Sequence, residues 1–159
     1  MINKCFKLNP LRNILSDPAE PLEFAVQFEP LRPFKSMIEL FIYKGTGGRW
    51  KYNILLESKE PEIDDIINIE SPLGKTSNVS FKLSNQFKAY AEFEAFFTPE
   101  SDSCFGIHPN RGILEPHGRD GTPFVISFSP TEYGAAKVGK LIIQTDDMYW
   151  SYAVKGTHP

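Results

Sequence analysis

The sequence contains four kinds of residue that could carry out chemistry: a GKTS tetrapeptide, histidines, paired aspartates and a cysteine between serines. The tetrapeptide occupies 74–77 and matches the end of the phosphate-binding loop motif. Such a loop also needs a glycine five positions earlier and a helix afterwards, because backbone N–H groups must cradle the phosphates. Ile69 stands at the first of these places, and alternating, strand-like residues follow at 79–83. We therefore predict a tight turn between strands.

The histidines and the paired aspartates lack the spacing of a metal site. The histidines stand apart, in or near proline-containing turns, at His108, His117 and His158. None has the i, i+4 or Cys-x-x-Cys spacing that metal coordination favours. The pairs Asp64-Asp65 and Asp146-Asp147 lack the alternating pattern of a calcium loop. We expect exposed turn side chains here, with no metal and no cofactor.

The cysteines are expected to be thiols without a catalytic role. Ser101 and Ser103 flank Cys104 without a histidine in a catalytic sequence context, although sequence alone does not fix which residues meet in space. We therefore predict a protein that is not an enzyme. Cys5 holds the matching place in an earlier copy of the same motif, so the two cysteines should lie in separate units. A disulfide would need their Cα atoms within about 7 Å.

Composition and charge narrow the class of protein. Hydrophobic residues make up 41% and charged residues 23% of the chain, which is typical of a globular protein with a core. Residues 1–60 carry a net charge of +2 and residues 61–159 a net charge of −5. This balance gives no reason to expect nucleic acid or anionic lipid as a partner. The first residues have no apolar signal core, and no stretch nears the ~20 apolar residues of a membrane span, so we expect a cytosolic chain without membrane insertion.

One motif occurs twice, as CFKLNPLRNIL at 5–15 and as CFGIHPNRGIL at 104–114. The two copies are 99 residues apart at the cysteines. They are 100 residues apart from FAVQF and FVISF as far as the triplets WKY and WSY. We expect the residues that mark this repeat to be fold determinants: Cys5, Phe6, Pro10, Phe24, Phe28, Pro30, Trp50, Tyr52, Cys104, Phe105, Pro109, Phe124, Phe128, Pro130, Trp150 and Tyr152. A period near 100 residues indicates duplicated whole domains.

Alternating apolar residues predict strands, with no helix of ordinary length. Phe124, Ile126 and Phe128 fall on one face of FVISF, and 87–97 alternates over its whole length. Residues 139–154 indicate a hairpin that turns at two aspartates, and KGTGG at 44–48 is the corresponding turn of the first copy. About seven short strands in 62–159 predict an all-β, immunoglobulin-like sandwich.

The two copies differ in what precedes their first motif. Some forty residues of the later unit precede Cys104, whereas only four residues precede Cys5. We therefore predict a partial unit at 1–61, with the later strands only, and a complete sandwich at 62–159. A sandwich without its opening strands leaves unpaired edges and half a core. Either the natural chain continues upstream or another segment completes the sheet, and we favour a fragment or isoform of a longer array.

Trp50 and Trp150 hold matching places in the last strands of the two units. Packing across the sandwich is the favoured interpretation for both, and an exposed anchor for a partner is the alternative. Tyr52 and Tyr152 have the same parity as the tryptophans, so each should share the face of its tryptophan and cap the core.

The order of several blocks resembles a known family. The succession SPLGKTSNVSFKLSN, FKAYAEFEAFF, FGIHPNRGILEPHGRDGTPFVISFSPTEYG, GKLIIQT and WSYAVKGTHP is similar to an ASH/MSP (PapD-like) immunoglobulin domain of very large ciliary proteins. The resemblance covers 62–159 and, for the later strands, 1–61. It implies a non-enzymatic scaffold of the ciliary axoneme, associated with the central apparatus of motile cilia and sperm flagella. The implied partners are other axonemal proteins and neighbouring domains of the same chain, with no nucleic acid and no small-molecule substrate.

A second hypothesis comes from the relatives of this fold, because MSP domains at membrane contact sites bind acidic peptide motifs. Such binding needs a basic groove. The weak candidates in the later unit are Lys137, Lys140 and Lys155. The net charge of −5 for residues 61–159 argues against this mode.

Overall fold

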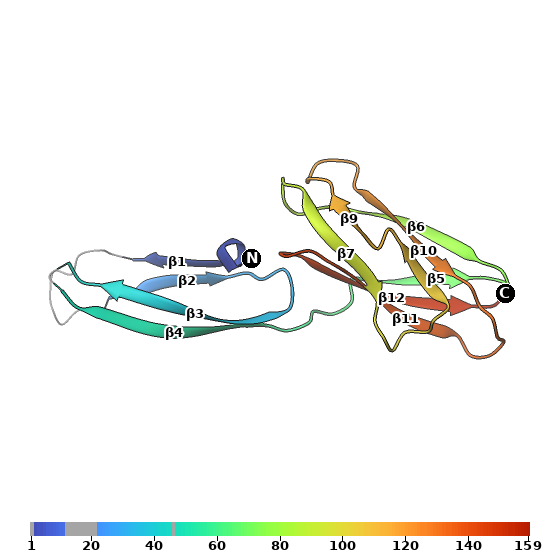
Figure 1. Ribbon diagram of the computed structural model, residues 1–159, viewed down its shortest axis with the longest axis horizontal. Helices are drawn as coiled ribbons and strands as arrows, with labels where there is room; N and C mark the ends of the chain where they lie inside the picture. Colours follow the sequence, from blue (N-terminus) through green and yellow to red (C-terminus); the bar gives the residue numbers. More distant parts are fainter. Residues whose placement is uncertain (1, 12–21, 46) are drawn as a thin grey trace. The chain divides into compact units, whose positions relative to one another are not determined.

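The computed structural model describes residues 2–11, 22–45 and 47–159. The chain divides into two compact units, unit 1 at 1–61 and unit 2 at 62–159. The regular structure described is almost entirely β (Figure 1). Its elements are α1 (Ile2–Cys5), β1 (Phe6–Pro10), β2 (Phe24–Phe28), β3 (Phe34–Tyr43), β4 (Arg49–Ser58), β5 (Asp65–Glu70), β6 (Ser77–Leu83), β7 (Ala91–Phe97), β8 (Phe105–His108), β9 (Arg111–Leu114), β10 (Thr122–Phe128), β11 (Lys137–Gln144) and β12 (Tyr149–Thr157).

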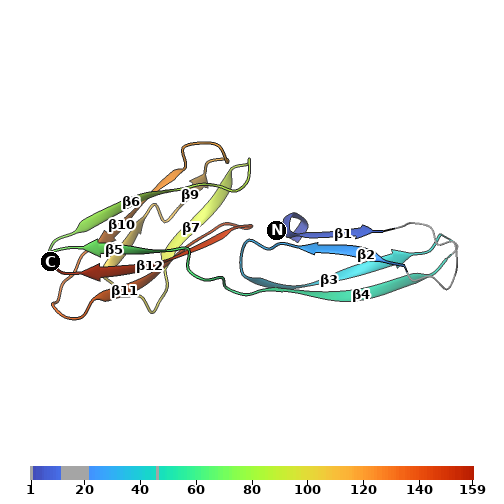
Figure 2. The same cartoon turned by 180° about the vertical axis from the view of Figure 1, so that it is seen from behind.

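Unit 2 is an immunoglobulin-like sandwich of two sheets, as the sequence predicts. One sheet has three strands in the order β6-β10-β8, and the other has five in the order β5-β12-β11-β7-β9. Neighbouring strands are antiparallel except β5, which runs parallel to β12. The reverse view shows β5, β12 and β11 as consecutive strands of the five-stranded sheet (Figure 2).

The core of unit 2 lies between these sheets and is rich in phenylalanine. Phe124, Ile126 and Phe128 of β10 are fully buried, as their predicted common face requires. The Phe124 ring centroid lies 5.5 Å from that of Phe81 on β6 and 4.9 Å from that of Phe93 on β7. Because β7 belongs to the other sheet, Phe124 joins the two layers.

Strand β7 begins at Ala91, so the prediction of one strand over 87–97 is wrong for its first four residues. The buried side chain of Asn85 accounts for the difference. Its Nδ2 donates to the carbonyl of Ala89 at 2.7 Å, and its Oδ1 accepts from the N–H of Phe87 at 2.9 Å. An asparagine that binds the backbone locally in this way favours a turn over a strand ladder.

The extended segment at 105–114 serves both sheets. Its first part, β8, pairs with β10, and its second part, β9, pairs with β7. The change of sheet falls between the two strands, where the peptide bond from His108 to Pro109 is cis. This crossing leaves β8 at the end of the three-stranded sheet.

Unit 1 repeats the strand pairing of the second half of unit 2. Phe6 faces Phe28 across β1 and β2, as Phe105 faces Phe128 across β8 and β10. The following backbone bond also recurs, because Glu29 N–H donates to the Cys5 carbonyl at 2.8 Å and Ser129 N–H donates to the Cys104 carbonyl at 2.9 Å. The duplication read from sequence is thus present in the hydrogen-bond ladders.

The terminal hairpins of the two units share one register. Trp50 faces Ile42 in β3 and β4, as Trp150 faces Ile143 in β11 and β12. Both turns form where predicted, with Gly47 and Gly48 at φ of 101° and 107° in the first. In the second, Thr145 Oγ1 accepts from the N–H of Met148 at 3.0 Å.

The predicted burial of Trp50 and Tyr52 in a sandwich core is wrong. Trp50 is 48% exposed and Tyr52 is 53% exposed, whereas Trp150 is 8% exposed. Tyr152 packs against the core, with its ring 5.3 Å from that of Phe81. Phe81 belongs to β6, and the described part of unit 1 has no strand equivalent to β6.

Candidate protein-binding surfaces

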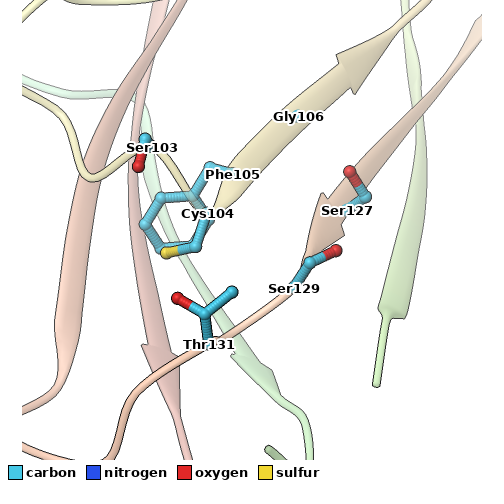
Figure 3. Close-up of a pocket in the computed structure, with 7 residues that line it drawn as sticks. All are labelled: Ser103, Cys104, Phe105, Gly106, Ser127, Ser129 and Thr131. Carbon is cyan, nitrogen blue, oxygen red and sulfur yellow. The ribbon is translucent and has the colours of Figure 1, made fainter. Parts of the chain in front are cut away.

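A pocket of about 260 Å³ opens beside β8 in unit 2. Figure 3 shows the residues that line it, which come from the loop before β8, from β8, and from the end of β10 and the residues after it. Its lining residues are Ser103, Cys104, Phe105, Gly106, Ser127, Ser129 and Thr131. Hydroxyl groups can both donate and accept hydrogen bonds, so this pocket suits a polar group.

The loop before β8 is fixed to β11. Val138 N–H donates to Asp102 Oδ2 at 2.7 Å, and Lys140 N–H donates to Ser101 Oγ at 2.9 Å. These bonds occupy the edge of β11 beyond the end of its pairing with β7. The serines on either side of Cys104 therefore have different roles, because Ser101 anchors the loop and Ser103 lines the pocket.

The Cys104 thiol is not activated. Burial raises its pKa, the charge of Asp102 raises it further, and a backbone hydrogen bond and the charge of Lys137 oppose these effects. A thiol with a raised pKa is a poor nucleophile at neutral pH. Cys104 and Cys5, both in the described part of the chain, are free cysteines. The pocket thus offers hydrogen bonds.

The edge of β8 lies beside this pocket. One side of β8 is bonded to β10, and no strand of the described residues is bonded to its other side. A strand with one unpaired side presents backbone N–H and C=O groups that a partner's strand can pair with. The pocket and the edge together form a candidate site for an extended peptide.

The structure does not bring the three candidate lysines together. Lys140 on β11 and Lys155 on β12 both point to the outer face of the five-stranded sheet by strand alternation. Lys137 has the opposite parity and lies near enough to Cys104 to affect its pKa. A basic groove built from all three lysines is therefore absent from the described surface.

The predicted turn residues have structural partners. Asp64 accepts from the N–H of Ser151 at 2.8 Å through Oδ2, which ties the start of β5 to β12. Sequence reasoning missed this role, for which the only signal was an acidic residue directly before a strand. His117 Nδ1 lies 3.0 Å from the Asn85 carbonyl, and His158 Nε2 lies 3.1 Å from the Glu132 carbonyl.

Two other kinds of site are absent from the described ranges. These ranges contain no group of three or more His, Cys, Asp or Glu side chains that could hold a metal ion. Across 2–11, 22–45 and 47–159, no helix is long and apolar enough to cross a membrane.

The phenol of Tyr152 provides a test of core packing through pH. Burial raises the pKa of Tyr152 to about 12, and Asp64 and Asp65 add to the effect. An unfolded tyrosine loses its proton near pH 10. Between about pH 10 and pH 12 the unfolded state therefore binds fewer protons, so stability falls as pH rises through this window and is unaffected below it. We expect Tyr152→Phe to remove this loss of stability, which urea unfolding at each pH measures. The same change should remove the latest phase of a tyrosine absorbance titration, which is the phase at the highest pH.

A matched control for this titration exists in the repeat. Tyr52→Phe changes the counterpart of Tyr152 in unit 1 and should leave the latest phase in place. If the latest phase survives in Tyr152→Phe, the assignment to Tyr152 is wrong.

By its sheets and strand order, the chain is an all-β protein of the immunoglobulin-like sandwich class. Residues 1–59 match the family described as "CFAP47-like, immunoglobulin-like domain". The chain is 39% identical over 139 residues to cilia and flagella-associated protein 47 of Mus musculus and 37% identical over 137 residues to that of Homo sapiens. These matches cover 87% and 86% of this chain but only 4% of each relative. The predicted resemblance to domains of a large ciliary protein is confirmed.

Two solved structures match part of this chain in their fold. The CupB2 chaperone of Pseudomonas aeruginosa has a TM-score of 0.47 at 12% identity, over 58% of this chain and 52% of that chain. SSP-19, an MSP-domain protein like family member in Caenorhabditis elegans, has a TM-score of 0.44 at 15% identity, over 60% of this chain and 94% of that chain.

Proposed function

We propose that the chain is a non-enzymatic structural and protein-interaction module of a large scaffold in the axoneme of cilia or flagella. The observation that carries the proposal is the 39% identity, over 87% of the chain, to a relative named cilia and flagella-associated protein. We further propose the central apparatus as its place, and support of cilium or sperm flagellum assembly and motility as its role. Its partners are other axonemal proteins and neighbouring domains of the same polypeptide.

The surfaces of unit 2 support an interaction role. The β8 edge can pair with a partner's strand, while the adjacent pocket receives a side chain of that strand. Main-chain hydrogen bonds then supply affinity and the pocket supplies selectivity. The raised pKa of Cys104 is consistent with a pocket that binds rather than reacts.

The experiment is a pull-down from detergent-extracted motile axonemes with tagged 1–159 as bait, read by mass spectrometry, with an acidic-motif peptide as competitor. We expect central-apparatus proteins to be retained in the presence of the competitor. Recovery of membrane-tether proteins that the peptide displaces would instead favour the acidic-motif hypothesis.

A pair of charge variants sharpens this experiment. Lys140→Glu combined with Lys155→Glu reverses the charge at two positions on the outer sheet face, and Lys75→Glu reverses it at one position in the turn between β5 and β6. We expect both baits to retain the same axonemal proteins. Selective loss with the double variant would contradict an interface at the β8 edge.

A further inference from the structure

The outer face of the five-stranded sheet of unit 2 has an apolar centre. By strand alternation, Phe96, Ile142 and Ala153 point away from the core, and the pairing of β7 with β11 sets Phe96 directly beside Ile142. All three are only part-buried, and Ile66 of β5, which pairs with Ala153, is 58% exposed. These four side chains run across four adjacent strands, and we call them the apolar band.

Charges of opposite sign lie on the two sides of the apolar band. Because β7 runs antiparallel to β11, the two strands begin at opposite ends of the sheet. Lys140 of β11 and Lys155 of β12 point outward toward the end at which β11 begins. Glu92 and Glu94 point outward toward the end at which β7 begins. The face is therefore basic on one side of the apolar band and acidic on the other.

One ion pair lies on the acidic side. Arg111 of β9 lies opposite Glu94, with its Nη2 at 3.7 Å from Glu94 Oε1. Both side chains are exposed, and an exposed ion pair of this length contributes little to stability. Glu94 can therefore bind a lysine of another molecule at small cost.

The outer face needs a second surface to cover it. A strand added at either edge of the five-stranded sheet extends that sheet sideways and leaves its outer face as it is. The matching face of unit 1 does not fit, because its charges run in the reverse order. In the shared register of the two hairpins, Glu39 and Leu55 hold the places of Lys140 and Lys155, and Arg49 lies toward the end where unit 2 is acidic.

We propose that this outer face pairs with the same face of a second copy of the chain. A two-fold axis that lies in the contact plane and runs across the strands near Ile142 brings the basic side of each copy over the acidic side of the other. Lys140 and Lys155 of one copy then meet Glu94 and Glu92 of the other, and the two apolar bands meet between them. The charge order makes the face complementary to itself in this orientation.

Such a dimer leaves the candidate peptide site accessible. Strand β8 and its pocket belong to the three-stranded sheet, which lies on the other side of the core. Each dimer would therefore present two β8 edges. The inference goes beyond the proposed function and does not rest on it.

The experiment is sedimentation velocity on the purified full-length chain at increasing concentration. We expect a reversible monomer–dimer equilibrium that is half complete on the order of tens of micromolar, as for a small interface with a polar border. Added salt should shift this equilibrium toward the monomer, because the charged contacts are exposed at the border.

Charge reversal on either side of the apolar band tests the proposed orientation. Lys140→Glu with Lys155→Glu, or Glu92→Lys with Glu94→Lys, should each weaken the dimer at least about tenfold, because like charges then meet. An equimolar mixture of the two double variants should dimerise again, because every contact then joins opposite charges. Circular dichroism checks that each variant is folded.

A matched control changes the same net charge elsewhere. Lys75 and Lys82 are both exposed, one in the turn after β5 and the other on β6 of the three-stranded sheet. Lys75→Glu with Lys82→Glu should leave the dimer unchanged. Its mixture with the Glu92→Lys, Glu94→Lys variant should not give the heterodimer that the proposed orientation predicts.

Four results would overturn the proposal. They are a monomer at every concentration, a dimer that neither charge reversal weakens, a mixture of the two variants that stays monomeric, and equal weakening by the control variant. The last result would mean that net charge, and not this face, governs association. Because only purified chain is used, failure of this experiment leaves the ciliary assignment standing, and failure of the axoneme pull-down leaves the dimer result standing.

Discussion

Replacing Phe124 with alanine is expected to destabilise unit 2 by about 3–5 kcal/mol, the range for removal of a large aromatic side chain from a core. Phe124 is fully buried and its ring contacts Phe81 in its own sheet and Phe93 in the other. Its loss leaves a cavity between the layers that neighbouring rings can fill only in part. Urea unfolding of the full chain, followed by fluorescence, measures the change.

The repeat supplies a matched control for this prediction. Phe24 holds the place of Phe124 in unit 1 but is only half-buried. We expect Phe24→Ala to cost less than half as much, because less area leaves water at that position. Equal costs for the two variants would contradict the difference in burial between Phe24 and Phe124.

Replacing Gly156 with alanine is expected to cost about 1–3 kcal/mol through overpacking. A Cβ atom at this position would lie 2.5 Å from Cε2 and Cζ of Phe128, whose side chain is fully buried. The ring cannot move away without disturbing the core between the sheets. Thermal unfolding monitored by circular dichroism measures the loss.

The neighbouring residue is the control for Gly156. Lys155 is exposed on the other face of β12, so Lys155→Ala should change stability by no more than about 0.5 kcal/mol. A neutral Gly156→Ala would mean that β12 can shift away from Phe128. The corresponding residue of unit 1 is Leu56, which is buried there, so the two cores fill this position differently.

The strands and their pairing could be predicted because the signals are local or repeated. Alternation places Phe124, Ile126 and Phe128 on one face, and a strand with one buried face has no other register that keeps them inside. The matching of Trp50 with Trp150 predicts equal positions in two hairpins, and both hairpins have that register.

Burial and partners could not be predicted from the same patterns, because they depend on strands elsewhere in the chain. Trp50 has the same local sequence context as Trp150 but lacks a covering strand in the described part of unit 1. The early residues of 87–97 alternate like a strand, yet the Asn85 side chain bonds their backbone into a turn.

The candidate site was also beyond sequence reasoning. The pocket beside Phe105 is made of small polar residues from two separate segments, 103–106 and 127–131, which have no diagnostic spacing. The grouping of Lys137 with Lys140 failed because an odd separation puts two strand residues on opposite faces. Only the pairing of β8 with β10 brings the hydroxyl groups together.

The central claim is that both units follow one strand scheme, in which β10 and β11 of unit 2 are paired on both sides whereas β2 and β3 are each paired on one side within the described residues of unit 1. Native-state hydrogen exchange of the full chain, resolved by residue with NMR, tests it most directly. We predict that amides of β10 and β11 exchange only through global unfolding of unit 2, whereas amides on the open edges of β2 and β3 exchange roughly a hundredfold faster or more. Comparable protection of the two sets would contradict the claim.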